Sequence, residues 1–133
     1  MAWVRCCGGT GKAPTSPYYF IDNNGQLNSE VTATGNYEQK LSWFRVYSGA
    51  NLSKTLNVRN FNRLYIEYTN YNQTDPVRLT INGTPTALTL NTTGDTRRTS
   101  QLDISSLEQL NSISFTMNNG SDFTEIHKLW IEI

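Results

Sequence analysis

The last third of the chain, residues 102–133, alternates apolar and polar side chains with a period of two. The apolar positions are Ile113, Phe115 and Met117 in the first run, and Leu129, Ile131 and Ile133 in the second. A period of two places one set of side chains on one face of a β-strand. Residues 118–122 between the runs contain Asn-Gly, a strong turn signal. The chain therefore ends in two half-buried strands, and upstream segments must cover their apolar faces.

Short alternating segments also occur upstream, separated by turn residues. The pair Ser105 and Glu108 has the spacing of a capping box, so we expect one helical turn over residues 105–110. About eight to ten short strands with such spacing predict an all-β fold, namely an antiparallel β-sandwich of jelly-roll type with an extended N-terminal arm. The upstream strands are expected at residues 18–22, 26–34, 39–47, 51–58, 64–68, 76–81, 87–91 and 96–104.

The first residues differ in composition from the rest, which predicts two parts: an N-terminal arm and linker at 1–17, and a sandwich domain at 18–133. Residues 8–17 are rich in Gly, Thr, Ser and Pro, as flexible linkers are. The short apolar segment before this linker cannot bury itself alone. It either folds back onto the domain or pairs as an edge strand with a partner. We expect an assembly arm made of Trp3, Val4, Arg5, Cys6 and Cys7.

Composition argues against several classes of partner. Charged residues make up 17% of the chain and the formal net charge is zero, whereas nucleic-acid binders usually carry a basic patch. No apolar run approaches the roughly 18 residues of a membrane span. The N-terminus lacks the apolar core of a secretory signal peptide. We therefore expect no nucleic-acid or membrane partner, and synthesis in a cytoplasm.

No residue set predicts an enzyme. The one histidine, His127, stands beside Lys128 in the terminal strand, and no motif supplies partners for a catalytic triad or a metal site. The 11 acidic residues are scattered, so a catalytic carboxylate pair is not indicated. Adjacent Cys6 and Cys7 are interpreted as reduced thiols, because neighbouring cysteines rarely pair with each other and two ligands do not hold a structural zinc. We expect no catalytic residues, no metal and no cofactor.

Large aromatic side chains alternate with core positions in the predicted strands, so they point outward. Exposed large aromatics mark an interface or a ligand platform, and a sugar ring can stack its apolar C–H face on such a ring. Three interpretations stay open: the arm or loops cover these rings, another subunit contacts them, or a cell-surface glycan binds them. The candidate binding residues are Trp43, Tyr47, Tyr65 and Trp130.

The order of segments from Tyr18 onward resembles a known group of proteins. The segments are Ile-Asp-Asn-Asn-Gly at residues 21–25, then an aromatic strand, residues 58–68, residues 102–107 and the alternating terminal strand. They resemble the small jelly-roll modules encoded by phages and prophages of Gram-positive gut bacteria, which look like carbohydrate-binding-module sandwiches. The start of the chain, residues 1–5, also looks like the start of virion structural proteins in such phages.

This resemblance implies a non-enzymatic virion structural protein, a capsid-surface, fibre or tail component that attaches through its N-terminal arm. It would be made in the host bacterial cytoplasm and located in the virion, as a homo-oligomer with other virion proteins as partners. The alternative is a carbohydrate-binding adhesin module that contacts the host cell surface.

Overall fold

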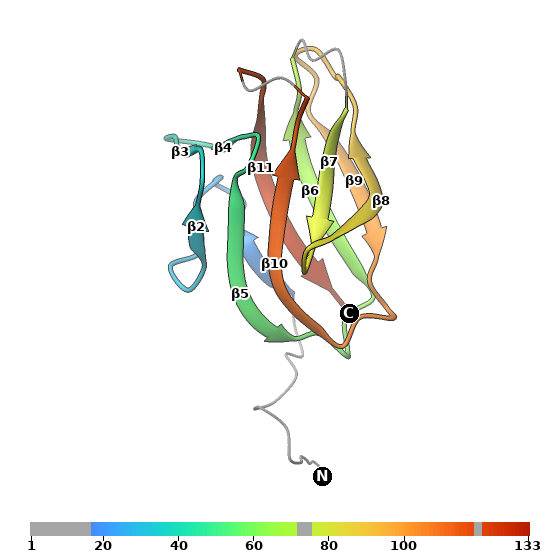
Figure 1. Ribbon diagram of the computed structural model, residues 1–133. Coiled ribbons are helices and arrows are strands. Elements are labelled where there is room, and N and C mark those ends of the chain that lie inside the picture. Colours follow the sequence, from blue (N-terminus) through green and yellow to red (C-terminus); the bar gives the residue numbers. More distant parts are fainter. Residues whose placement is uncertain (1–16, 72–75, 119–120) are drawn as a thin grey trace.

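The computed structural model describes residues 17–71, 76–118 and 121–133, which form two antiparallel sheets packed face to face (Figure 1). Sheet A has six strands, in the order β3-β4-β11-β6-β9 with β1 beside β11. Sheet B has five strands, in the order β2-β5-β10-β7-β8. The predicted all-β sandwich is confirmed. Residues 1–16 of the predicted N-terminal arm, including the proposed assembly residues Trp3 to Cys7, lie outside the described residues.

The chain crosses between the two sheets several times, so each sheet contains strands from distant parts of the sequence. Those of sheet A are β1 (Tyr18–Ile21), β3 (Tyr37–Gln39), β4 (Phe44–Tyr47), β6 (Arg63–Thr69), β9 (Arg98–Asp103) and β11 (Phe123–Glu132). Those of sheet B are β2 (Thr32–Thr34), β5 (Asn51–Asn57), β7 (Val77–Ile81), β8 (Thr84–Leu90) and β10 (Gln109–Thr116).

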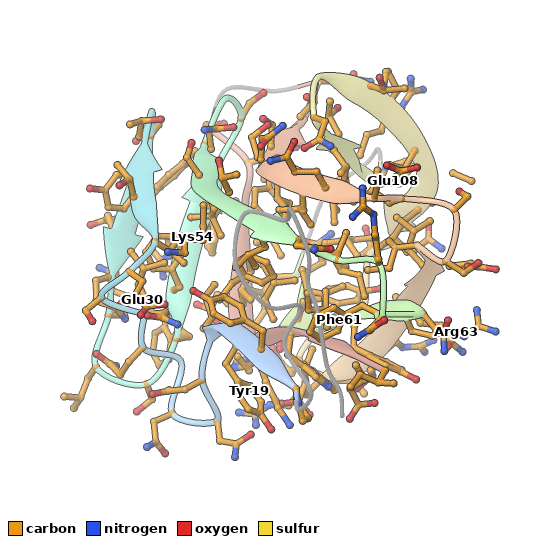
Figure 2. The ribbon with its side chains drawn as sticks, turned by 90° about the horizontal axis from the view of Figure 1, so that it is seen from below. Tyr19, Glu30, Lys54, Phe61, Arg63 and Glu108 are labelled. Carbon is orange, nitrogen blue, oxygen red and sulfur yellow. The ribbon has the colours of Figure 1, made fainter. Side chains whose placement is uncertain are left out.

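The core lies between the sheets, where alternate side chains of both meet. Ile66 of β6 pairs with Leu129 of β11, and Phe115 of β10 pairs with Leu79 of β7. All four are fully buried, and burial of one such side chain stabilises the fold by about 1.5–3 kcal/mol. Seen along the strands, the buried Phe61 lies between the two sheets (Figure 2). The predicted inward positions of Ile66 and Phe115 are confirmed.

Strand β11 holds sheet A together. One edge pairs with β4 through residues 123–126 and with β1 through residues 129–131, while the other edge pairs with β6. The register with β6 shifts between Ile126 and Lys128. Such a shift adds one residue to one strand, and a β-bulge of this kind re-aims side chains. His127 and Lys128 therefore both lie opposite Glu67.

Two predicted strands are interrupted by turns. The segment 39–47 divides into β3 and β4, because Lys40 N donates to Trp43 O at 2.9 Å and closes a tight turn. The segment 26–34 contributes only β2. Its earlier part turns at Asn28, whose side-chain oxygen accepts Glu30 N at 2.8 Å and whose carbonyl accepts Val31 N at 3.0 Å. Asn side chains commonly form such local bonds in place of a ladder.

The predicted helical turn at residues 105–110 is wrong. Asp103 Oδ1 accepts hydrogen bonds from Ser105 N at 2.8 Å and from Ser105 Oγ at 2.6 Å. Leu107 N donates to Ile104 O at 2.9 Å, so the segment closes as a turn and does not continue as a helix. Glu108 instead receives Arg59 Nη2 at 3.2 Å, and the chain enters β10 at Gln109.

Candidate functional site

Aromatic side chains gather on the outer face of sheet A because of the strand register. Trp130 of β11 pairs with Tyr19 of β1 on one side and with Tyr65 of β6 on the other. Side chains of paired residues point to the same face of an antiparallel sheet. Tyr19 lies on the side of sheet A that faces away from sheet B (Figure 2). We call Tyr19, Tyr65 and Trp130 the aromatic row, and each of them is half-buried.

The rings of the aromatic row have a defined geometry. Those of Tyr65 and Trp130 stack with centroids 5.1 Å apart and planes 15° apart. Lys128 Nζ lies 4.0 Å from the Trp130 ring centroid and 5.3 Å from that of Tyr19. Stacked pairs contribute about 0.5–1.5 kcal/mol beyond their burial, and cation–π contacts at exposed sites about 0.5–1 kcal/mol. These contacts hold the rings in a defined orientation.

Polar side chains border the aromatic row toward β9. Gln101 pairs with Tyr65, Thr99 pairs with Glu67, and both β9 residues are exposed. Glu67 is the cross-strand neighbour of Lys128, yet its carboxylate lies 3.5 Å from Arg97 Nη1. Hydroxyl, amide and charged groups therefore surround the rings, as they do in sites that bind a polar molecule with an apolar face.

A second cluster occupies the same face at the other end of β11. Glu125 accepts Arg45 Nη2 at 3.2 Å and the Tyr71 hydroxyl at 3.1 Å. The hydroxyl of Tyr47 donates to Glu38 Oε1 at 2.8 Å. This bond lowers the pKa of Glu38, and the hydrogen bond to Glu125 raises the pKa of Tyr71. Lys40 Nζ lies 3.3 Å from Glu38 Oε2, so the two carboxylates of this cluster are matched by two cations, Arg45 and Lys40.

Aromatic rings also contact one another in this second cluster. The guanidinium carbon of Arg45 lies 4.1 Å from the centroid of the Phe123 ring, and the ring of Tyr47 lies 5.9 Å from it. Tyr47 is therefore held by a ring contact and by its bond to Glu38. The side chains of the second cluster are therefore held in place by hydrogen bonds and ring contacts with one another.

His127 lies between these two groups and is 7% exposed. Its Nε2 is 2.8 Å from Thr69 Oγ1, and its Nδ1 is buried without a hydrogen-bond partner. Burial, and then the nearby Arg97, lower the pKa of this imidazole. The site of His127 therefore disfavours the charged form of its ring, and Thr69 is the hydrogen-bond partner that the described residues give this ring.

The four residues predicted as binding residues are divided between these groups. Tyr65 and Trp130 stack together in the aromatic row, and Tyr47 belongs to the second cluster. Trp43 directly precedes β4 and is half-buried, and its indole Nε1 is enclosed without a hydrogen-bond partner. Of the four predicted residues, only Tyr65 and Trp130 are therefore neighbours, and their role in binding stays a prediction.

Two residues of this outer face, Tyr19 and Lys128, were not among the predicted binding residues. Tyr19 stands in a run of adjacent aromatic residues, Tyr18 to Phe20, so alternation alone did not decide which ring points outward. Lys128 lies two residues before Trp130 in the same strand. That spacing of two was a usable signal for a shared face.

The described residues offer neither a metal cluster nor a membrane-spanning helix. In these parts of the chain, no group of three or more His, Cys, Asp or Glu side chains lies close enough to hold a metal ion. Over the same residues, no helix has the length and hydropathy needed to span a bilayer.

Solved structures share this fold, although no protein-family model and no curated protein sequence matches the chain. A point mutant of the family 29 module CBM29-2 has a TM-score of 0.65 and 14% identity, with 88% of this chain and 91% of that chain covered. The family 29 module CBM29_1 from Piromyces equi has a TM-score of 0.60 and 12% identity over 89% and 91% of the two chains. The family 11 module from Clostridium thermocellum, in complex with a mixed-linked tetrasaccharide, has a TM-score of 0.57 and 11% identity over 90% and 97%.

These three structures are carbohydrate-binding modules, which confirms the predicted resemblance at the level of the fold. None of the three is a virion protein, so they give the phage part of the resemblance no support. The same fold also occurs within an enzyme chain. A family two carbohydrate esterase from Cellvibrio japonicus has a TM-score of 0.57 and 15% identity, and the match covers 90% of this chain but 33% of that chain.

Proposed function

We propose that this protein is a non-enzymatic carbohydrate-binding module whose ligand site is the outer face of sheet A. The observation that carries the proposal is the aromatic row, in which three adjacent strands place Tyr19, Trp130 and Tyr65 side by side. Half-buried aromatic rings on a sheet face are held by the fold and still contact solvent. They can therefore bind the apolar face of a sugar.

The arrangement suits a saccharide in a second respect. A pyranose has an apolar C–H face bordered by hydroxyl groups, so its site needs rings with hydrogen-bonding groups beside them. Gln101 and Thr99 supply an amide and a hydroxyl next to Tyr65 and Glu67. Because Tyr65 and Trp130 already stack on one another, little side-chain freedom is lost on binding, which favours affinity.

The fold likeness supports the proposal without deciding it. The solved structures that share this fold include carbohydrate-binding modules of families 29 and 11, one of them in complex with a tetrasaccharide. Their identity to this chain is too low to transfer a ligand. The local argument from the aromatic row therefore carries the assignment.

A structural role in a virion, with attachment through the arm, stays a prediction from sequence resemblance. No described residue favours it over carbohydrate binding. The two roles are also compatible, because a virion can display a sugar-binding domain. Co-sedimentation of the full chain with phage particles would test the virion role separately.

The proposed function is tested by screening the full chain on a glycan array and then by affinity electrophoresis in gels containing the polysaccharides that bind. We expect Trp130→Ala and Tyr65→Ala each to weaken binding by about tenfold or more, equal to about 1.4 kcal/mol. Leu41→Ala is the matched control, because Leu41 is 92% exposed but lies in the turn between β3 and β4. Its binding should equal that of the wild type. An array without saturable binding, or equal losses in all three variants, would overturn the proposal.

A further inference from the structure

We infer that the saccharide bound by sheet A is acidic, with a ring carboxylate, as in a hexuronic acid, that pairs with Lys128. This inference rests on the proposed function and specifies its ligand. It comes from the placement of one ammonium group on the aromatic row and from the charges around it.

The first observation is where Lys128 lies. Its Nζ is 4.0 Å from the Trp130 ring centroid and 5.3 Å from that of Tyr19. The side chain is half-buried, so its aliphatic part covers apolar surface while the ammonium remains at the edge of the rings. An ammonium has three donor hydrogens, and contact with ring faces uses none of them for a conventional hydrogen bond.

The second observation is that the carboxylate on the residue opposite Lys128 is engaged elsewhere. Glu67 is the cross-strand neighbour of Lys128, and such opposite charges usually pair. Its carboxylate instead lies 3.5 Å from Arg97 Nη1. Among the residues that the structure describes, Lys128 forms no salt bridge with a carboxylate.

The other carboxylates on this face lie beside arginine side chains, as Glu67 does. Glu38 and Glu125 both bind Arg45 in the second cluster. Beyond Trp130, Glu132 and Asp103 are both cross-strand neighbours of Arg63. Arg63, two residues before Tyr65, therefore has a carboxylate opposite it on each side, whereas the carboxylate opposite Lys128 pairs with Arg97. Among the described cations beside the aromatic row, Lys128 is the one whose cross-strand carboxylate is engaged by another residue.

These features match the two parts of a uronic acid. Tyr65 and Lys128 already contact the Trp130 ring, so the C–H face of the sugar would lie against Tyr19 beside it. Its carboxylate would accept a charge-assisted hydrogen bond from Lys128 Nζ. The rings exclude part of the water around the ammonium, which strengthens the attraction. A neutral sugar would gain the ring contact alone. The competing explanation is that Lys128 only covers the rings, and the experiment below separates the two.

The experiment uses acidic and neutral glycans with the same backbone, so that only the carboxylate differs. The probes are oligomers of glucuronate and glucose, of galacturonate and galactose, and of mannuronate and mannose, measured by calorimetry with the full chain. We expect one pair to show about tenfold tighter binding of the acidic member at low salt. At about 0.5 M salt this preference should shrink, because salt screens the ion pair.

Three variants assign the preference to one side chain. Lys128→Met keeps the aliphatic length and removes the charge, so it should abolish the preference for the acidic member. Lys128→Arg keeps the charge and should retain the preference. Lys54→Met removes a lysine from sheet B, where it lies 4.0 Å from Glu30, and should leave binding unchanged.

Each outcome decides a different claim. If the wild type binds neutral members as tightly as acidic ones, or if Lys128→Met keeps the preference, the acidic-ligand inference is wrong while carbohydrate binding stands. If no glycan binds at all, the proposed function fails and the inference fails with it.

Discussion

The outer faces of the two sheets have opposite characters. On sheet B, Ser114 pairs with Asn51 of β5 on one side and with Thr80 of β7 on the other. Its hydroxyl donates to Asn51 Oδ1 at 2.6 Å, and Asn51 Nδ2 donates to Ser53 Oγ at 2.8 Å. The corresponding positions of sheet A carry the rings of the aromatic row and many charged side chains.

The comparison shows that the sandwich folds with a polar outer face on sheet B, and that aromatic rings on an outer face are not required for packing. Short hydroxyl and amide side chains on sheet B bond to one another and keep the face soluble. In the strands of sheet B, the aromatic side chain is Phe115, which points into the core. Exposed rings are not required by a sandwich, because a sheet needs only one apolar face to pack. Packing of the two sheets alone therefore does not account for the aromatic row, which agrees with the binding role proposed for it.

The largest expected effect is on stability and concerns the hydrophobic core, to which both sheets contribute. Phe115→Ala on sheet B should lower the free energy of unfolding by about 3–5 kcal/mol, and Ile66→Ala on sheet A by about 2–5 kcal/mol. Both side chains are fully buried, and total stability is typically only about 5–15 kcal/mol. Urea melts of both variants measure this. A loss under about 1 kcal/mol in either variant would mean that its strand face is assigned wrongly.

The next effect concerns the turn beside Trp43. Gly25 has a φ of 73°, and a Cβ there would lie 2.3 Å from Ser42 O and 2.4 Å from Trp43 Cα. Gly49 also has a positive φ, of 92°, but a Cβ there would meet nothing within 4 Å. Gly49→Ala should therefore cost about 1–2 kcal/mol for its backbone conformation.

Gly25→Ala adds backbone overlap to the same strain, so it should cost clearly more than Gly49→Ala. It should also weaken sugar binding, since it displaces the chain that enters β4 of sheet A. Thermal melting and affinity electrophoresis of both variants measure these effects. Equal melting temperatures for the two variants would show that the turn adapts without strain.

A pair of substitutions, one on each outer face, tests the contrast directly. Tyr19→Ala should weaken sugar binding by about threefold to tenfold and change stability little, because its ring is half-buried on the ligand face. Ser114→Ala removes a hydrogen bond to Asn51, so it should cost about 0.5–1.5 kcal/mol of stability and leave binding unchanged. Loss of binding in the Ser114 variant would place the ligand on sheet B.

The sequence predicted inward positions well because burial imposes a strict period of two. Phe115 and Ile66 were placed correctly for that reason. The predictions from sequence were wrong where side chains bond to the nearby backbone, as at Asn28 and at Asp103. Such bonds replace strand or helix hydrogen bonds, and the alternation of apolar and polar residues does not reveal them.

Grouping on the outer face was harder to predict. Which rings become neighbours depends on strand order, and a strand pattern does not specify which strands pair. Tyr65 and Trp130 are 65 positions apart, and they meet only because β6 lies beside β11. Lys128 lies on the same face because it stands two residues before Trp130 in β11, a spacing that is visible in the sequence.

The smallest expected effect is the pH dependence of the free energy of unfolding that comes from His127. This residue lies in β11 of sheet A. Its lowered pKa, caused by burial and by Arg97, means that the folded protein disfavours the protonated imidazole. Glu67 and Glu125 face it as well and partly oppose this effect. An unfolded histidine takes up a proton near pH 6.5. Stability that is present above this pH should therefore fall as the pH drops from about 7 toward 5, because the unfolded state then binds more protons.

The variant His127→Gln should show a shallower decline over that interval, since it keeps a polar group near Thr69 Oγ1 without titrating. Glu38 and Asp103 have lowered pKa values, so their contributions are lost only at lower pH and do not obscure the histidine. Free energies of unfolding from urea melts at about pH 7, 6 and 5 measure both slopes. Parallel curves for the wild type and His127→Gln would show that this histidine titrates alike in the folded and unfolded chains, and that the outer face of sheet A does not couple stability to pH.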